Sequence, residues 1–354
     1  MSEEVKQFQS ENNVEIVGVL VSYEFKDILT KKDKIPMKIG NLKVRSAEGE
    51  THTVQMMAMK WYKRDMEKSE DKRDIQGGFK AIETIENEYI SEEETKSDSS
   101  EHVGKTPSEV RVRGNLEPNI FKTKAGQEVK DIRIQGRFVN RLNVSEDVPH
   151  QAIVRLSGFV GADPIPEVGK DGEETGRYKL DLRVIDYQNK AVPIDLFAGK
   201  VTDDDGGEVD AGEWIADNYE KGQTVTVDAD IVNRYIVKEV EREGGGFGKK
   251  MVDTKRDVLR ERAIFSGTEP LDFDDFDEDN NADREKVVFP DQMKEAIENY
   301  DTYVADQLAQ AEKRNEANSD DKPATGKRGA MGSGGASKGG SKKSAKDKLD
   351  SLPF

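Results

Sequence analysis

The stretch WIADNYEKGQTVTVDADIVNRY, residues 214–235, decides the fold. Trp214, Ile215 and Tyr219 are spaced as on a short helix, and a Lys-Gly turn follows at 221–222. From Thr224 onward apolar and polar residues alternate with many β-branched side chains, which is typical of a half-buried strand. The stretch therefore predicts a helix that leads directly into a strand.

Strand patterns lie on both sides of this stretch. AIVRLSGFVGA (152–162), YKLDLRVIDYQ (178–188) and AVPIDLFAGK (191–200) come before it. MVDTKRDVLRERAIF (251–265) comes after it and is expected to return as the second strand of a long hairpin around EGGGFG. Five strands with a helix between the third and the fourth follow the plan of the OB-fold, a small Greek-key barrel.

The first half of the chain repeats the same order. VEIVGVLVSYEF (14–25), IGNLKVRS (39–46) and THTVQMMAMKWY (51–62) predict three strands, and a second long hairpin with a Gly turn is expected from about 108 to 142. A polar insertion at about 64–107 is expected to replace the short helix. A repeat of roughly this size indicates domain duplication rather than a solenoid.

We therefore predict a mainly β fold with two tandem OB-fold barrels, long β-hairpin arms, a C-terminal helix and a disordered tail. After the barrels, Met293, Ile297, Tyr300, Val304, Leu308 and Ala311 recur at helical spacing behind Pro290. The predicted parts are an N-terminal arm (1–12), OB-fold 1 (13–145), OB-fold 2 (150–268), an acidic-aromatic linker (269–288), an amphipathic helix (289–316) and a Gly/Ser/Lys tail with a docking tip (317–354).

Residues 214–235 and the ending KLDSLPF (348–354) resemble single-stranded DNA-binding proteins of the bacterial and phage type. The resemblance implies that the chain binds and protects single-stranded DNA without strong sequence preference during replication, recombination or repair. It also implies that partner enzymes dock on the tip, where the Phe354 ring enters an apolar pocket and Asp347 and Asp350 meet cations, with Leu352 and Pro353 between them. The family's four-barrel arrangement implies a homodimer, and the large insertion and mixed tail favour a phage or mobile-element member.

The charge of the chain is unevenly distributed. The net charge is −17, which argues against a polyanion ligand because binding depends on Lys and Arg displacing counterions. Residues 26–64 nevertheless hold ten Lys/Arg against four Asp/Glu, a net of +6, and residues 109–143 hold eight against four, a net of +4. The acidic surplus is expected in insertion and linker segments, away from the binding surface.

Single-strand binding needs cations along the backbone and aromatic faces on which bases stack. We expect each site residue to be an aromatic near a strand end or a cation beside one, although a core role is the alternative for every ring and is favoured for Phe159 and Trp214. In the first repeat the candidates are Tyr23, Phe25, Lys26, Lys43, Arg45, Lys60, Trp61, Tyr62, Lys63, Phe121, Lys122 and Lys124. In the second they are Arg177, Tyr178, Arg183, Arg234, Tyr235, Phe247, Lys249 and Lys250.

Several classes of function find no support in the sequence. Without cysteine there is no disulfide framework and no thiolate site. The GGGFGKK stretch lacks the spacing of a phosphate-binding loop, and no catalytic constellation or cofactor motif emerges, so we expect neither an enzyme nor a cofactor. The seven carboxylates between Asp272 and Asp283 lie on one contiguous segment, which is unlike a metal site and indicates a solvated linker, a strip that competes with DNA, or a docking motif.

No signal peptide or membrane span is expected, which predicts a soluble cytoplasmic protein. Two other functions stay open. One is a recombination mediator or annealing protein, which would also promote pairing of complementary strands. The other is an interaction scaffold whose barrels bind protein rather than nucleic acid.

Overall fold

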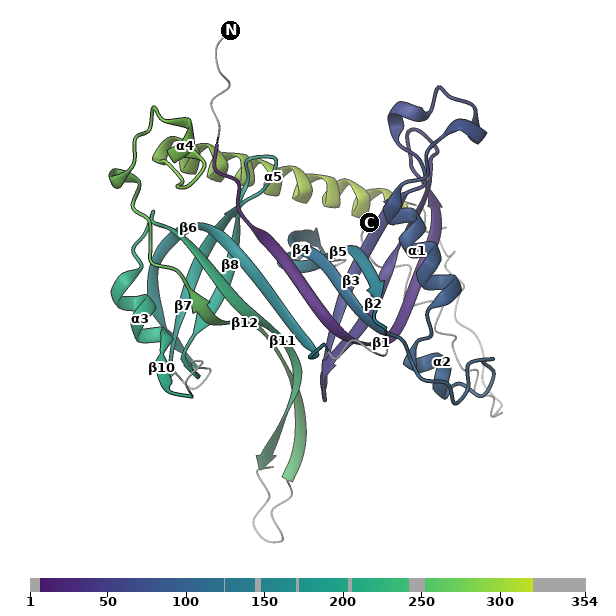
Figure 1. The fold of residues 1–354 in the computed structure, drawn as a ribbon, viewed down its shortest axis with the longest axis horizontal. Helices are drawn as coiled ribbons and strands as arrows, with labels where there is room; N and C mark the ends of the chain where they lie inside the picture. Colours follow the sequence, from purple (N-terminus) through teal and green to yellow (C-terminus); the bar gives the residue numbers. More distant parts are fainter. Residues whose placement is uncertain are drawn as a thin grey trace, which may run out of the picture. The chain divides into compact units, whose positions relative to one another are not determined.

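In the computed structural model the chain is described over residues 7–123, 125–143, 148–169, 172–202, 206–241 and 252–320. The fold is mainly β, and its largest sheet has ten strands (Figure 1).

The first barrel consists of β1 (Asn12–Leu29), β2 (Pro36–Ala47), β3 (Glu50–Met59), β4 (Glu109–Lys122) and β5 (Glu128–Arg141). β1 pairs antiparallel with β2 and with β4, and β2 pairs antiparallel with β3. A parallel pairing of β3 with β5 closes the circle, because β5 also neighbours β4. This closed order is that of the OB-fold, so the prediction for this half of the chain is confirmed.

The second barrel repeats the plan with β6 (Gln151–Val168), β7 (Glu174–Ile185), β8 (Ala191–Ala198), β11 (Thr224–Glu241) and β12 (Val252–Gly267). β6 pairs antiparallel with β7 and β11, β7 pairs with β8, and β8 meets β12 in parallel. The predicted helix is α3 (Ala211–Asn218), just before β11. The small hairpin of β9 (Lys200–Thr202) and β10 (Glu208–Asp210) precedes it.

The two barrels correspond residue by residue. In each, the pairing of the first two strands slips by one residue, after Leu20 and after Val160. Two residues earlier the strands approach so closely that only glycine fits, because a Cβ on Gly18 or Gly158 would lie 2.1 or 2.2 Å from a carbonyl oxygen of the next strand. When the two bulges are aligned, residues of the first barrel have counterparts at the same register positions of the second. The equivalent pairs are Arg45 with Arg183, Lys43 with Asp181, Thr53 with Asp195, His52 with Ile194, and Val21 with Gly161.

The first strands of the two barrels join them into one sheet. Residues Asn12–Val17 of β1 pair with Gln151–Leu156 of β6 while the same part of β1 also pairs with β4. Val14 and Ile16 are buried, as are Val154 and Leu156 on the partner strand. The first strand of each barrel, β1 or β6, therefore belongs to its own barrel and also pairs with the first strand of the other barrel (Figure 1).

The insertion in the first repeat is folded, and the expectation that it replaces the helix is wrong. It contains α1 (Gly77–Glu88) and α2 (Glu92–Lys96), between β3 and β4, together with the short 3₁₀ helices η1 (Lys63–Asp65) and η2 (Glu70–Lys72). Phe79, Ile82 and Ile85 of α1 are buried, and their spacing of three residues places them on one face. The first repeat thus keeps a helix at the OB-fold position.

The chain that follows the second barrel begins with η3 (Phe273–Asp275) and α4 (Asn281–Arg284). The predicted C-terminal helix is then confirmed as α5 (Pro290–Asp320). Its first turns bury Ala296 in a cluster with Phe8, Phe159, Ile185, Ala191 and Val288. Ile297, predicted on the buried stripe, is instead 38% exposed.

A second compact unit consists of Asn119–Asp131 of the β4–β5 hairpin and the chain from Asp301 onward. Within it, the Lys122 ammonium lies 3.6 Å from carboxylate oxygens of Glu128 and Glu312, and Asn315 donates to the Thr123 carbonyl. Both barrels lie mainly in the first unit. The tail was predicted from residue 317, but α5 continues to Asp320, and the chain from residue 321 lies outside the described residues.

Candidate nucleic-acid interface

The outer face of the first barrel carries two lysines without a carboxylate partner. Lys43 of β2 is exposed, whereas its neighbours Leu42 and Val44 are fully buried, so strand alternation turns Lys43 outward. Lys26 of β1 is partly exposed, and among the residues that the structure describes neither lysine forms an ion pair. Glu24 is also exposed on β1, so this part of the face keeps a small positive excess.

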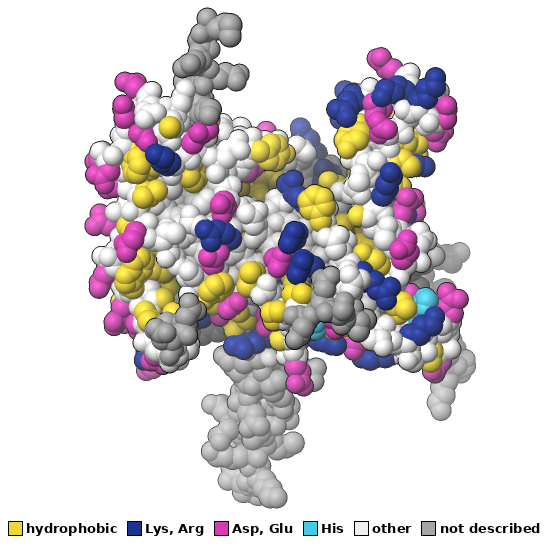
Figure 2. All heavy atoms as spheres, viewed as in Figure 1, with side chains coloured by type: hydrophobic (Ala, Val, Ile, Leu, Met, Phe, Trp, Pro, Cys, Tyr) yellow, Lys and Arg dark blue, Asp and Glu magenta, His cyan; other side chains and the backbone are white. Residues whose placement is uncertain are grey.

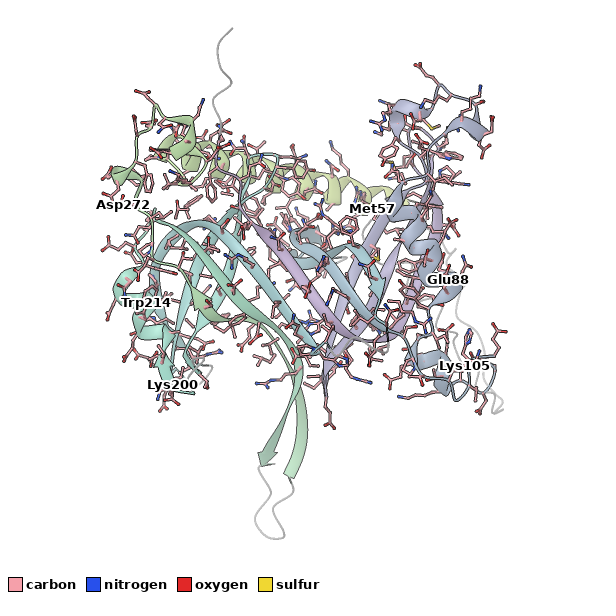
Figure 3. All side chains as sticks on the ribbon, in the orientation of Figure 1. Met57, Glu88, Lys105, Lys200, Trp214 and Asp272 are labelled. Atoms are coloured by element: carbon pink, nitrogen blue, oxygen red, sulfur yellow. The ribbon has the colours of Figure 1, made fainter. Side chains whose placement is uncertain are left out.

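Apolar and polar side chains lie beside these lysines. Lys43 pairs with Thr53 of β3, and Lys26 pairs with Ile39, which in turn pairs with Met57. The Met57 side chain is 52% exposed on β3 (Figure 3). We call the outward residues Lys26, Lys43, Thr53 and Met57 the first-barrel face.

The hairpin of β11 and β12 continues beyond the second barrel as an arm (Figure 1). Near its start Tyr235 pairs with Val258 and Asn233 pairs with Arg260. Tyr235 is 69% exposed and Val258 is 45% exposed. Because residues two apart on a strand share a face, Tyr235, Val258 and Arg260 lie on one side of the arm.

Arg234 and Arg260 are both exposed, and neither forms an ion pair within the described part of the chain. The same alternation turns Arg234 to the side of the arm opposite Tyr235, where it pairs with Leu259. We call Tyr235, Val258 and Arg260 the arm base.

The arm base adjoins the first barrel. Arg234 pairs with Glu50 at the start of β3, the backbone N–H of Asn233 donates to a Glu50 carboxylate oxygen at 3.2 Å, and the Asn233 side chain donates to the Thr51 carbonyl. On β3, Thr51 lies two residues from Thr53 of the first-barrel face. Tyr235 and Lys43 come from different barrels, yet they belong to adjoining stretches of the sheet.

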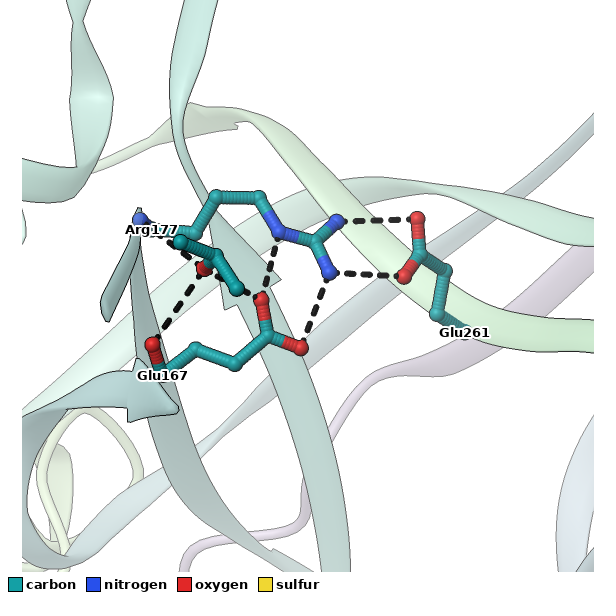
Figure 4. A network of polar contacts seen from close by, with 4 residues as sticks. Glu167, Arg177 and Glu261 are labelled. Carbon is teal, nitrogen blue, oxygen red and sulfur yellow. Dashed lines mark hydrogen bonds and ion pairs between the residues drawn. The ribbon is translucent and has the colours of Figure 1, made fainter. Parts of the chain in front are cut away.

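Two of the cations predicted in the second barrel, Arg177 and Arg183, are occupied by carboxylates. Arg177 binds Glu167 and Glu261 through four hydrogen bonds of 2.8–3.0 Å, two to each carboxylate (Figure 4). These bonds raise the pKa of Arg177 and lower that of Glu167. The guanidinium also lies 5.2 Å from the centroid of the Phe197 ring.

Arg183 and Lys179 are occupied in the same way. Arg183 donates to Asp181 at 2.7 and 3.1 Å, and Lys179 lies 2.8 Å from Asp195. Tyr178 is partly buried beneath α3, where a Cβ on Gly212 would lie 3.1 Å from its ring.

Tyr23 and Phe25 are not on the first-barrel face. They pair with Leu42 and Gly40, and alternation turns them away from the side that carries Lys43. Their rings stack on each other with centroids 6.2 Å apart, and the Tyr23 hydroxyl donates to Glu94 of α2. Burial and the Glu94 carboxylate raise the pKa of Tyr23 to about 12. Arg45 is also drawn to α2, where it binds Glu92.

Trp61 is buried, at 7% exposed, rather than presented on a strand end. The Lys60 ammonium and the Arg73 guanidinium lie 5.0 and 4.8 Å from its ring centroid. Tyr62 is 39% exposed with Arg64 at 4.8 Å from its ring. Lys63 lies 3.6 Å from Asp33. These residues lie in the segment after β3, where the Trp61 and Tyr62 rings already form cation–π contacts with neighbouring side chains.

Phe159 and Trp214 were expected to be core residues, and the remaining site candidates lie outside the two surfaces named above. Phe159 is buried as expected at 3% exposed, whereas Trp214 on α3 is half-buried with its ring edge against Tyr219 (Figure 3). Phe121 is partly exposed in the second unit, where Lys122 has the acidic partners given above. Lys124, Phe247, Lys249, Lys250, Asp347, Asp350, Leu352, Pro353 and Phe354 lie outside the described residues.

Sequence reasoning missed Met57, Val258 and Arg260. The signal for Arg260 was available, because aligning the two strands of the predicted hairpin places it diagonally across from Tyr235. Met57 sits in the run MMAM of the predicted strand 51–62, where the residue types do not show which side chains face outward. Its exposure follows from alternation with the buried Met56.

Charge on the surface is mixed. Figure 2 shows Lys and Arg interleaved with Asp and Glu over the face in view. Within the described chain no three His, Asp or Glu side chains are grouped closely enough to hold a metal ion.

Over the same residues, none of the helices combines the length and the apolar character needed to cross a membrane.

Comparisons with known proteins give one family and several solved structures. The family described as YorF matches residues 10–303, and no curated protein matches the chain. The wild-type single-stranded DNA-binding protein from Thermus aquaticus is 14% identical, with a TM-score of 0.40 over 75% of this chain and 95% of that one. A deletion mutant of the same protein is also 14% identical, with a TM-score of 0.41 over 75% of this chain and 96% of that one.

A replication protein A heterotrimer bound to single-stranded DNA is 10% identical, with a TM-score of 0.18 over 74% of this chain and 51% of that one. These scores are too low to establish a shared fold. The OB-type assignment follows instead from the strand pairing of each barrel.

Proposed function

We propose that this chain, which belongs to the YorF family, binds and protects single-stranded DNA without strong sequence preference. In this proposal the strand crosses the first-barrel face and the arm base. The role extends to replication, recombination or repair, and no bond is made or broken.

One observation carries the proposal: exposed cations that form no ion pair among the described residues adjoin an exposed tyrosine on neighbouring strands of an OB-type sheet. Within the described part of the chain Lys43 and Arg260 form no ion pair, so each can take a phosphate without first giving up a carboxylate. Tyr235 offers an open ring face, and every base can stack on such a face whatever its identity. Binding of this kind is insensitive to sequence because phosphates and π-faces are common to all nucleotides.

The arrangement also favours single strands over duplexes. In a duplex the bases are stacked on each other, so their faces are closed to Tyr235 and only the phosphates remain. Two further parts of the proposal rest on the resemblance in the sequence: recruitment of partner enzymes by Leu352, Pro353 and Phe354, and pairing of two chains into a four-barrel dimer.

Fluorescence anisotropy with labelled oligonucleotides tests the proposal. We expect single-stranded DNA to bind much more tightly than a duplex of the same length, and its affinity to fall as salt rises, with a slope of about −0.7 for each phosphate contact. Equal binding of single strands and duplexes, or retention of neither at low salt, would instead favour a protein-binding scaffold.

The variant Tyr235→Ala examines the stacking part of the proposal. Loss of one stacked base costs about 1–3 kcal/mol, which weakens binding roughly 5- to 150-fold. Tyr187→Ala is the matched control, because Tyr187 is 78% exposed on the turn between β7 and β8 and is no part of the proposed site. The two variants should therefore differ clearly in affinity while their melting temperatures stay alike.

A further inference from the structure

The two barrels differ in charge at equivalent positions of one outer face. Lys43 and Thr53 pair across β2 and β3 of the first barrel. The equivalent pair in the second barrel is Asp181 and Asp195 on β7 and β8. A lysine beside a neutral residue therefore corresponds to two neighbouring carboxylates.

The cations around these carboxylates are already bound. Arg183 lies against Asp181, Lys179 against Asp195, and Arg177 between Glu167 and Glu261 (Figure 4). This part of the second barrel thus sets three cations against four acids, whereas Lys43 stands without an acidic partner within the described chain.

Local backbone geometry keeps the Arg183–Asp181 pair flat on the sheet. The pair lies over the bulge residue Gly161, where a Cβ would come within 2.7 Å of the Arg183 Nε and 2.8 Å of an Asp181 carboxylate oxygen. In the first barrel the bulge residue is Val21, and the equivalent Arg45 turns away to Glu92 of α2. The first barrel lacks this pair because Lys43 stands where the second barrel has Asp181.

The ring on the same surface of the second barrel is covered as well. Phe197 of β8 lies beneath the Arg177 guanidinium, which is fixed by two carboxylates. A base could stack on Phe197 only after Arg177 had left both partners.

We infer that the outer face of the second barrel is closed to the strand, so that Lys43 and Asp181 decide which barrel holds it. These ion pairs are partly exposed, and ion pairs that water reaches are individually weak, so a phosphate could compete for their cations. The carboxylates would stay in place, however, because Asp181 and Asp195 belong to β7 and β8, the strands that form this face. After a phosphate had taken their cations, both carboxylates would repel it at short range. The first barrel offers cations without that repulsion.

This inference rests on the proposed function and narrows it. Both barrels share the OB plan, yet one barrel and the arm base of the other form the whole interface. A chain with two OB barrels then occupies a stretch of DNA suited to one barrel.

Exchanging charges at the two equivalent positions tests the inference. In anisotropy titrations with oligo(dT) at low salt, we expect Lys43→Asp to weaken binding about tenfold or more and Asp181→Lys to strengthen it several-fold, with a steeper salt dependence. Lys105→Asp and Asp217→Lys impose the same changes of charge at exposed positions outside both faces and should shift affinity by about twofold at most.

The wild-type protein supplies a second measurement that needs no variant. Titrations with oligo(dT) of increasing length should reach full affinity within about 4–16 nucleotides, the span of one OB barrel. Affinity that keeps rising to twice that span, or a loss in Lys179→Ala and Arg183→Ala equal to that in Lys43→Ala, would overturn the inference while leaving the proposed function intact. Wild-type protein that binds no single-stranded DNA would overturn both.

Discussion

His52 of β3 sits in the core of the first barrel, where the second barrel has Ile194 at the equivalent position. It is 1% exposed, and its Nε2 lies 2.8 Å from the Ser46 hydroxyl. Its Nδ1 has no hydrogen-bond partner among the described residues. Burial lowers the pKa of His52 from 6.5 to about 4, although the Glu50 carboxylate lies 3.6 Å from Nε2.

This buried histidine should make folding sensitive to acid. The unfolded chain binds the proton below about pH 6.5 and the folded chain only below about pH 4, so the folded state loses stability as pH falls through that window. The full loss amounts to about 3 kcal/mol. Urea unfolding at pH 7 and pH 5 should show a smaller difference for His52→Ile than for wild-type protein.

A histidine outside the core provides the control. His102 is partly exposed after α2, and His102→Gln should leave the acid sensitivity of unfolding at the wild-type level. If His52→Ile and wild-type protein lost the same stability between the two pH values, the carboxyl groups would be the sole cause and the account of His52 would be wrong.

At the scale of elements, the first turns of α5 are held against the second barrel by the N-terminal segment. Phe8 is 7% exposed in the cluster with Ala296 and Val288. Its backbone N–H donates to the Gln292 side chain at 3.2 Å, and the Gln292 amide donates back to the Phe8 carbonyl at 2.8 Å. The Phe8 ring and these two hydrogen bonds therefore hold the N-terminal segment against the first turns of α5.

Removing the ring should destabilise this part of the fold. Phe8→Ala deletes a buried aromatic side chain, and we expect a loss of about 3 kcal/mol in the free energy of unfolding. Gln9→Ala, at an exposed neighbouring position, should leave stability within about 0.5 kcal/mol of wild type. Denaturant midpoints measure both, and equal midpoints would show that the N-terminal segment does not brace α5.

The elements that the sequence predicted well are those with strong local patterns. Most strands follow from period-two alternation, because they have one buried and one more exposed face, although residues 156–160 of β6 are buried on both sides. The helix in the first repeat was missed because only Phe79, Ile82 and Ile85 contact the core within a highly charged stretch. Three buried side chains suffice to dock α1, but they barely alter its average composition.

The sequence predicted only some of the site residues, for a different reason. Phe25 and Lys26 are adjacent in sequence, and alternation separates them onto opposite faces. The partners of Arg177 are 10 and 84 residues away, so no local pattern shows that its charge is occupied. Exposed cations and paired cations look alike in a sequence, and only tertiary contacts tell them apart.

At the scale of the whole chain, a net charge of −17 is compatible with a nucleic-acid interface because Lys26, Lys43 and Arg260 form no ion pair among the described residues. The two barrels follow one plan, and different residues at a few equivalent positions give them different surfaces. Lys43 and Asp181 express that difference most simply. Acidic residues of the second barrel can then raise solubility without opposing a strand that is bound to the first.

Photocrosslinking maps the bound strand directly. A single-stranded oligonucleotide that carries iododeoxyuridine is bound to the full chain and irradiated, and the crosslinked peptides are identified by mass spectrometry. The account predicts crosslinks at Tyr235 and in the peptides that contain Lys43 and Met57. Crosslinks confined to β7 and β8, or to the loop that holds Trp61, would contradict it.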